Sequence, residues 1–107
     1  MKALNTMQFV ANAAEEMANY KRNIEAAESY DMAKRIGNQA FGYLNCLITF
    51  LNTMICHENN DFTGDFDEVI DNWRTDIYQA VINNAVATKQ DHEIIWKLLM
   101  KRDGKEV

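Results

Sequence analysis

The chain contains one long stretch without a charged residue, from Ile36 to Cys56, and its hydrophobic pattern predicts a helix at the centre of the fold. Apolar side chains recur there at helical spacing in two adjacent rows. One row holds Phe41, Leu44, Ile48, Leu51 and Ile55, and the other holds Tyr43, Leu47, Phe50 and Met54. Because the rows cover more than half of the circumference, this helix must be covered on several sides. A polar strip remains, formed by Asn38, Asn45, Thr49 and Asn52.

A second periodic stretch precedes this helix and extends from Asn5 or Thr6 to Ala27. Its inward positions step by three and four residues: Ala3, Thr6, Val10, Ala13, Met17, Tyr20, Ile24 and Ala27. The apolar phase slips near residues 28–29, which predicts a break with Ser29 as the N-cap of the next helix. An antiparallel hairpin would then pair large side chains with small ones: Met17 with Ala40, Tyr20 with Gly37, and Ile24 with Ala33. One continuous dimerising helix over residues 5–58 is the alternative.

The second half of the chain predicts two further helices. The central helix should end near residues 58–60 and be followed by a loop over residues 59–65. Asp65 with Glu68 resembles a capping box and would start a third helix, with its seam at Phe66, Ile70, Trp73, Ile77 and Ala80. That helix should loosen over residues 83–88, where the seam reaches Asn84. A short helix capped by Thr88 or Asp91 would follow, with Ile94, Ile95, Leu98 and Leu99 facing inward and residues 103–107 fraying.

The predicted fold class is therefore all-α: a small antiparallel helical bundle of three longer helices plus one short C-terminal helix, in a single domain of residues 1–107. The composition agrees, since the 107 residues include no proline and only four glycines. Three asparagines and two threonines within residues 36–56 argue against a membrane span. No export signal is visible at the N-terminus, and the two cysteines lie too far apart on one helix to bridge, so we expect a cytoplasmic protein with buried, inert cysteines.

Charge narrows the functions that the chain can have. The net charge is −5 and no basic stripe is present, which argues against direct nucleic-acid binding. Acidic side chains concentrate in one segment as Asp61, Asp65, Asp67, Glu68, Asp71 and Asp76. The first hypothesis is a non-enzymatic helical protein-interaction module, such as a small inhibitor or regulator of the mobile-element or phage type. It would dock this acidic surface onto a partner protein with a basic groove. It would also self-associate as a homodimer through the strip of Asn38, Asn45, Thr49 and Asn52.

The alternative hypothesis is a Mg²⁺-dependent hydrolase similar in chemistry to all-α nucleotide pyrophosphatases. Carboxylates on neighbouring helix faces can converge on a hard cation, and the candidates are Glu15, Glu16, Glu68 and Asp71. The chain departs from the EExxE pattern of those enzymes, because Asn19 stands at its last position. Neither histidine has a recognised metal-ligand spacing, and no cofactor is expected under the first hypothesis.

Overall fold

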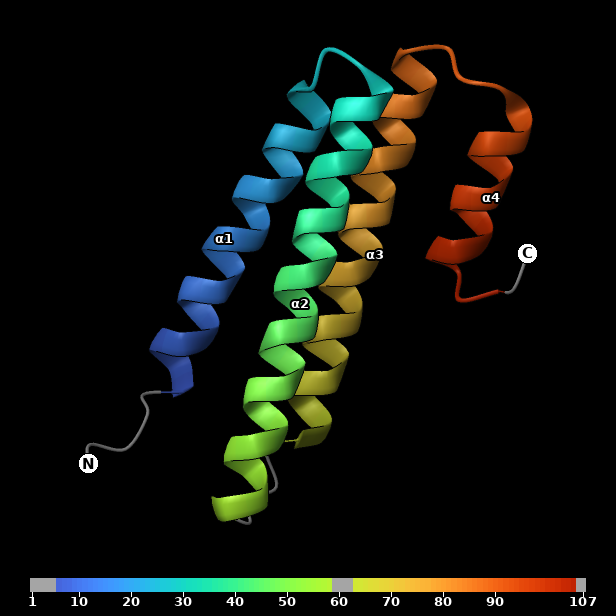
Figure 1. The fold of residues 1–107 in the computed structure, drawn as a ribbon. Coiled ribbons are helices and arrows are strands. Elements are labelled where there is room, and N and C mark those ends of the chain that lie inside the picture. The colour runs from blue at the N-terminus through green and yellow to red at the C-terminus, as the bar shows by residue number, and fades with distance from the viewer. Residues whose placement is uncertain (1–5, 59–62, 106–107) are drawn as a thin grey trace.

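The computed structural model describes the backbone of residues 6–58 and 63–105 and the side chains of residues 8–50 and 67–105. The described residues form four helices and no strand: α1 (Thr6–Ala26), α2 (Tyr30–Glu58), α3 (Thr63–Ala87) and α4 (His92–Arg102). The three long helices lie side by side in alternating direction, and the short α4 folds back along the C-terminal half of α3 (Figure 1). This arrangement confirms the predicted all-α bundle of three longer helices and one short helix.

The break between α1 and α2 lies where the slip in the apolar pattern predicted it. The Ser29 side-chain oxygen accepts a hydrogen bond from the Met32 backbone N–H at 3.1 Å, which is the expected N-cap bond. α1 and α2 then pack together as a hairpin, so the alternative of one continuous helix over residues 5–58 is wrong. The predicted inward positions of α1 that are buried include Ala13, Met17 and Ile24.

One predicted pair across the hairpin is wrong. Gly37 faces α3 instead of Tyr20: a Cβ atom at Gly37 would lie 3.1 Å from Val81 Cγ2 and near no other side chain of the described residues. The Tyr20 ring lies against Tyr43, with 6.0 Å between ring centroids. A two-helix pairing rule fails here because α3 packs against both α1 and α2 and takes the close approach that the glycine allows.

The core lies between α1, α2 and α3. Its buried side chains are Ala13, Met17, Ile24, Ala33, Ala40, Leu44, Leu47, Ile70, Ile77, Ala80 and Val81. Within the predicted seam of α3, Ile70, Ile77 and Ala80 are buried and Trp73 is half-buried. The side chain of Phe66 lies outside the described residues. No described helix is long and apolar enough to cross a membrane.

The ends of α3 differ from the prediction. The helix begins at Thr63, so Asp65 is its third residue and the proposed cap at Asp65 is wrong. At the other end, Asn84 does not loosen the helix. Its side chain is 3% exposed, and Nδ2 donates to the carbonyl oxygens of Ala27 at 3.0 Å and Ile24 at 3.4 Å. Asn84 therefore ties the C-terminal end of α1 to α3.

α3 and α4 end in the same way. After α3, the N–H groups of Lys89 and Gln90 bond back to the carbonyls of Val86 and Ala85, and Lys89 has a left-handed φ of 59°. After α4, Gly104 takes the corresponding position with φ 73°. Both are Schellman motifs, in which glycine is the usual left-handed residue. Residues 103–105 are thus held by hydrogen bonds, and the prediction that they fray is wrong.

α4 packs more loosely than expected. Among the described residues, its Cα atoms come within 8 Å of those of α3 and not of those of α2. None of its side chains is buried: the four predicted inward residues, Ile94, Ile95, Leu98 and Leu99, are half-buried. Asp91 precedes the helix, but its side chain makes no capping hydrogen bond. α4 therefore packs peripherally, on one side of a three-helix bundle.

Candidate binding groove

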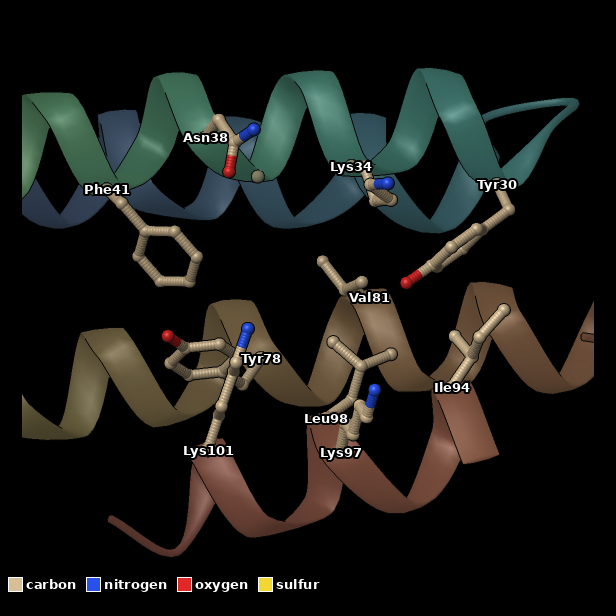
Figure 2. Close-up of a pocket in the computed structure, with 11 residues that line it drawn as sticks. Tyr30, Lys34, Asn38, Phe41, Tyr78, Val81, Ile94, Lys97, Leu98 and Lys101 are labelled. Carbon is tan, nitrogen blue, oxygen red and sulfur yellow. The ribbon is translucent and has the colours of Figure 1, made fainter. Parts of the chain in front are cut away.

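A groove of about 300 Å³ lies between α2, α3 and α4 (Figure 2). It exists because α4 packs on α3 alone, which leaves the space between α4 and α2 unfilled. The apolar part of its lining is Gly37, Phe41, Tyr78, Val81, Ile94 and Leu98, and the polar part is Tyr30, Lys34, Asn38, Lys97 and Lys101. This volume is at the lower end of the range of ligand-binding pockets.

The floor of the groove is aromatic and aliphatic. The Phe41 ring of α2 lies against the Tyr78 ring of α3, with 4.6 Å between centroids and a tilt of 40°. Gly37 contributes no side chain, so the Val81 side chain packs close to the α2 backbone. An apolar group placed here would leave water for an aromatic surface.

Three lysines line the groove, and no carboxylate among the described residues does. Lys34 comes from α2, whereas Lys97 and Lys101 come from the opposite wall on α4 (Figure 2). This is unusual in a chain with 16 acidic and 11 basic residues. Lys97 also pairs with Glu93 at 3.4 Å, but both side chains are well exposed, so the pair contributes little free energy and can be exchanged for another carboxylate. The charged residues that line the groove are therefore all basic, in an acidic protein.

Tyr30 closes one end of the groove. The Lys34 ammonium lies 5.5 Å from the centroid of the Tyr30 ring, a cation–π contact that holds the two residues together. Partial burial, and next the negative charge of Asp31, raise the pKa of the Tyr30 hydroxyl above its usual value of 10.0. The hydroxyl therefore stays protonated at neutral pH and points into the groove as a hydrogen-bond donor (Figure 2).

Of the predicted acidic surface, Asp67, Glu68 and Asp71 share about 100° of the circumference of α3, whereas Asp76 lies outside that arc. Asp67, Glu68, Asp71 and Asp76 are all exposed on α3, while the side chains of Asp61 and Asp65 lie outside the described residues. Asp76 lies beside Lys21 in a small crevice between α1 and α3, about 140° around the helix from Asp71. Asp71 is 3.7 Å from Arg74. The docking role of these acids stays a prediction.

Of the carboxylates of the magnesium alternative, Glu68 lies at a different level along the bundle from Glu15, whereas Asp71 is nearly level with it. α1 and α3 run in the same direction (Figure 1), and Asn84 bonds to residues 57 and 60 positions earlier on the α1 side. Glu68 is therefore level with residues 8–11 of α1, roughly 6–10 Å along the axis from Glu15. All four candidates, Glu15, Glu16, Glu68 and Asp71, are exposed. Within the described part of the chain, no three His, Cys, Asp or Glu side chains are placed to hold a metal ion.

The polar strip of α2 divides between two surfaces. Asn38 lines the groove, whereas Asn45 and Thr49 lie on the exposed face with Cys46. The side chain of Asn52 lies outside the described residues. Cys46 is exposed, so the prediction of a buried cysteine is wrong for this residue. Its position is about 100° from the buried Leu47, which explains the difference.

The sequence did not reveal the three lysines as a group. Lys97 and Lys101 suit the C-terminal half of a helix electrostatically, and that local explanation is sufficient without the groove that they also line. Lys34 lies in α2 and is separated from Lys97 and Lys101 in the sequence by the whole of α3. The three lysines line the same groove only because α4 folds back along α3. The i, i+4 spacing of Lys97 and Lys101 was the one available signal.

Comparisons of the chain with protein-family models, with curated proteins and with solved structures found no match.

Proposed function

We propose that this protein is a non-enzymatic interaction module that binds an acidic segment of a partner protein in the groove between α2, α3 and α4. The observation that carries the proposal is the set of three lysines, from two helices, around an apolar floor without a carboxylate. The partner has the charge opposite to the one expected from the acidic segment of α3. The role as a module that docks onto another protein is the same.

The apolar floor and the three lysines of the groove contribute differently to the proposed binding. An aromatic or aliphatic side chain of the partner packs against Phe41 and Tyr78, and burial of such a group contributes about 1.5–3 kcal/mol. Carboxylates of the same segment lie near Lys34, Lys97 and Lys101. Since these lysines reach solvent, each ion pair contributes about 0–1 kcal/mol and weakens with salt. The lysines therefore select the partner more than they hold it.

A random peptide library displayed against the full protein tests this function. We expect enriched peptides to combine Asp or Glu with a large apolar residue. Their affinity, measured by fluorescence anisotropy, should fall at least about tenfold in a Lys97→Glu, Lys101→Glu variant, because two attractions become repulsions. Affinity should also decrease with added salt.

The matched control is Lys21→Glu with Lys105→Glu, which makes the same change in net charge at exposed positions outside the groove. It should change affinity less than about twofold at moderate salt. Enrichment of peptides without acidic residues would contradict the proposal. So would equal losses of affinity in the two double variants.

A further inference from the structure

The solvent-facing side of α2 is free of charge over residues 36–50. Its exposed residues are Asn38, Gln39, Gly42, Asn45, Cys46, Thr49 and Phe50. The same helix carries exposed Asp31 and Arg35 one turn earlier, so the change along this face is abrupt. Phe50 is 42% exposed although its ring stacks on Phe9 of α1 at 5.6 Å.

A second copy of this chain is the partner that such a face suits. In a two-fold symmetric interface, a residue near the axis meets its own copy, so any charge there would face a like charge. Two copies of a protein with net charge −5 also repel each other, which makes a contact without charge the favourable one. The Asn45 side chain can both donate and accept hydrogen bonds and can therefore pair with its own kind, whereas the Thr49 hydroxyl already donates to the Asn45 carbonyl at 3.0 Å.

We propose that two copies pair through antiparallel α2 helices about a two-fold axis at Cys46. In this register Gly42 and Phe50, each four residues from Cys46, lie opposite each other in the two copies. A Cβ atom at Gly42 would meet nothing within 4 Å among the described residues, so there is open space above this residue. The exposed ring of Phe50 fills that space in the partner copy, a large group against a small one. Asn45 and Thr49 flank the contact, around a shallow depression that they form with Cys46 and Phe50.

The centre of this contact is distinct from the groove. It uses residues 42–50, whereas the groove is lined on α2 by residues 30–41, so Asn38 belongs to the groove and not to the contact. A dimer could therefore hold two partner segments. Failure of the dimer would leave the peptide-binding proposal unaffected, and the reverse also holds.

The decisive variant is Gly42→Lys. The new side chain has room in the single copy, and the loss of a helix-interior glycine favours α2 by up to about 1 kcal/mol. At a protein concentration low enough for the wild type to be monomeric, the melting temperature of Gly42→Lys should therefore equal or exceed that of the wild type. The lysine places a charge where Phe50 of the partner copy must lie. Sedimentation equilibrium of the full chain in reducing buffer should show a concentration-dependent dimer for the wild type and a monomer for Gly42→Lys. Asn23→Lys, at an exposed position of α1, is the control with the same charge change and should remain dimeric.

Cys46 gives a second measurement. In a Cys56→Ser background, diamide takes up the two thiol hydrogens and joins the Cys46 side chains of two copies as a disulfide, which needs Cα atoms within about 7 Å. The cross-link should form at least about tenfold faster than in the same background with Gly42→Lys, since only the dimer holds the thiols together. A wild type that is monomeric at all concentrations, or a Gly42→Lys variant that dimerises like the wild type, would overturn the proposal. Equal cross-linking rates would do the same.

Discussion

The hydrogen bonds of Asn84 give the most specific prediction for stability. Replacing Asn84 by Ala removes the Nδ2 donor from the Ala27 carbonyl at 3.0 Å, and that carbonyl then lacks this partner. The loss amounts to about 1–3 kcal/mol. The bond to Ile24 is 3.4 Å long and adds little. A small cavity costs about 1 kcal/mol more.

One effect of Asn84→Ala raises the free energy of unfolding. Asn84 Oδ1 is buried and has no hydrogen-bond partner among the described residues, so its removal returns about 1 kcal/mol. We therefore expect Asn84→Ala to lower the free energy of unfolding by about 2 kcal/mol and the melting temperature by about 8 °C. Urea unfolding followed by circular dichroism measures the change. A loss below about 0.5 kcal/mol would refute the role of Asn84 as a tie between α1 and α3.

The Asn84→Asp variant adds a pH test of the same bond. An ionised carboxylate would face the Ala27 carbonyl without a proton to donate, and its burial costs more than the alanine change. The pKa of the introduced carboxyl in the folded state is therefore raised above its unfolded value of about 3.9. The penalty is full above the folded pKa, shrinks as pH falls through it, and disappears below about 3.9. Relative to the wild type, Asn84→Asp should become more stable as pH is lowered, whereas Asn84→Ala should show no such trend. Parallel pH dependence of the two variants would contradict the donor assignment.

Two further predictions concern backbone positions. Gly37→Ala should lower the free energy of unfolding by about 1 kcal/mol, because the contact of 3.1 Å between the new Cβ atom and Val81 outweighs the gain in helix propensity. In a Val81→Ala background, the same substitution should cost less. A Gly37→Ala variant that is more stable than the wild type would contradict the close approach. Lys89→Gly should raise the melting temperature by a few degrees, because the left-handed φ of 59° costs a non-glycine residue about 1 kcal/mol. Gln90→Gly is the control, since Gln90 does not have a left-handed φ, and it should not raise the melting temperature.

Sequence periodicity predicted the features that depend on neighbouring residues of one helix. The break at Ser29, the buried positions of α1 and the class of the fold follow from spacing and capping alone. It failed where a third helix competes for a position, as Val81 does at Gly37. The pattern also could not distinguish two structural roles of a polar residue at an inward-facing position of a helix. Asn84 could end the helix or bond across the bundle, and only the position of the Ala27 carbonyl distinguishes the two.

The groove could not be predicted from the sequence, for a different reason. Its lysines each have an adequate local explanation, and they become a group only through the direction in which α4 leaves α3. That direction depends on the Schellman turn at Lys89 and on the Thr88 hydroxyl, which donates to the Asn84 carbonyl at 2.8 Å. A left-handed lysine has no signature in composition or periodicity, whereas the glycine at the end of α4 does.

The absence of buried side chains on α4 also bears on how this protein can change over evolutionary time. The core is made by α1, α2 and α3, whereas α4 contributes half-buried Ile94 and Leu98 and exposed Lys97 and Lys101 to one wall of the groove. Under the proposed function, substitutions at Ile94, Lys97 and Lys101 would alter what the groove binds with little effect on the stability of the core. Folding and the proposed recognition would then be separable properties in this chain, and new partner preferences could arise on α4 without compensating changes elsewhere in the bundle.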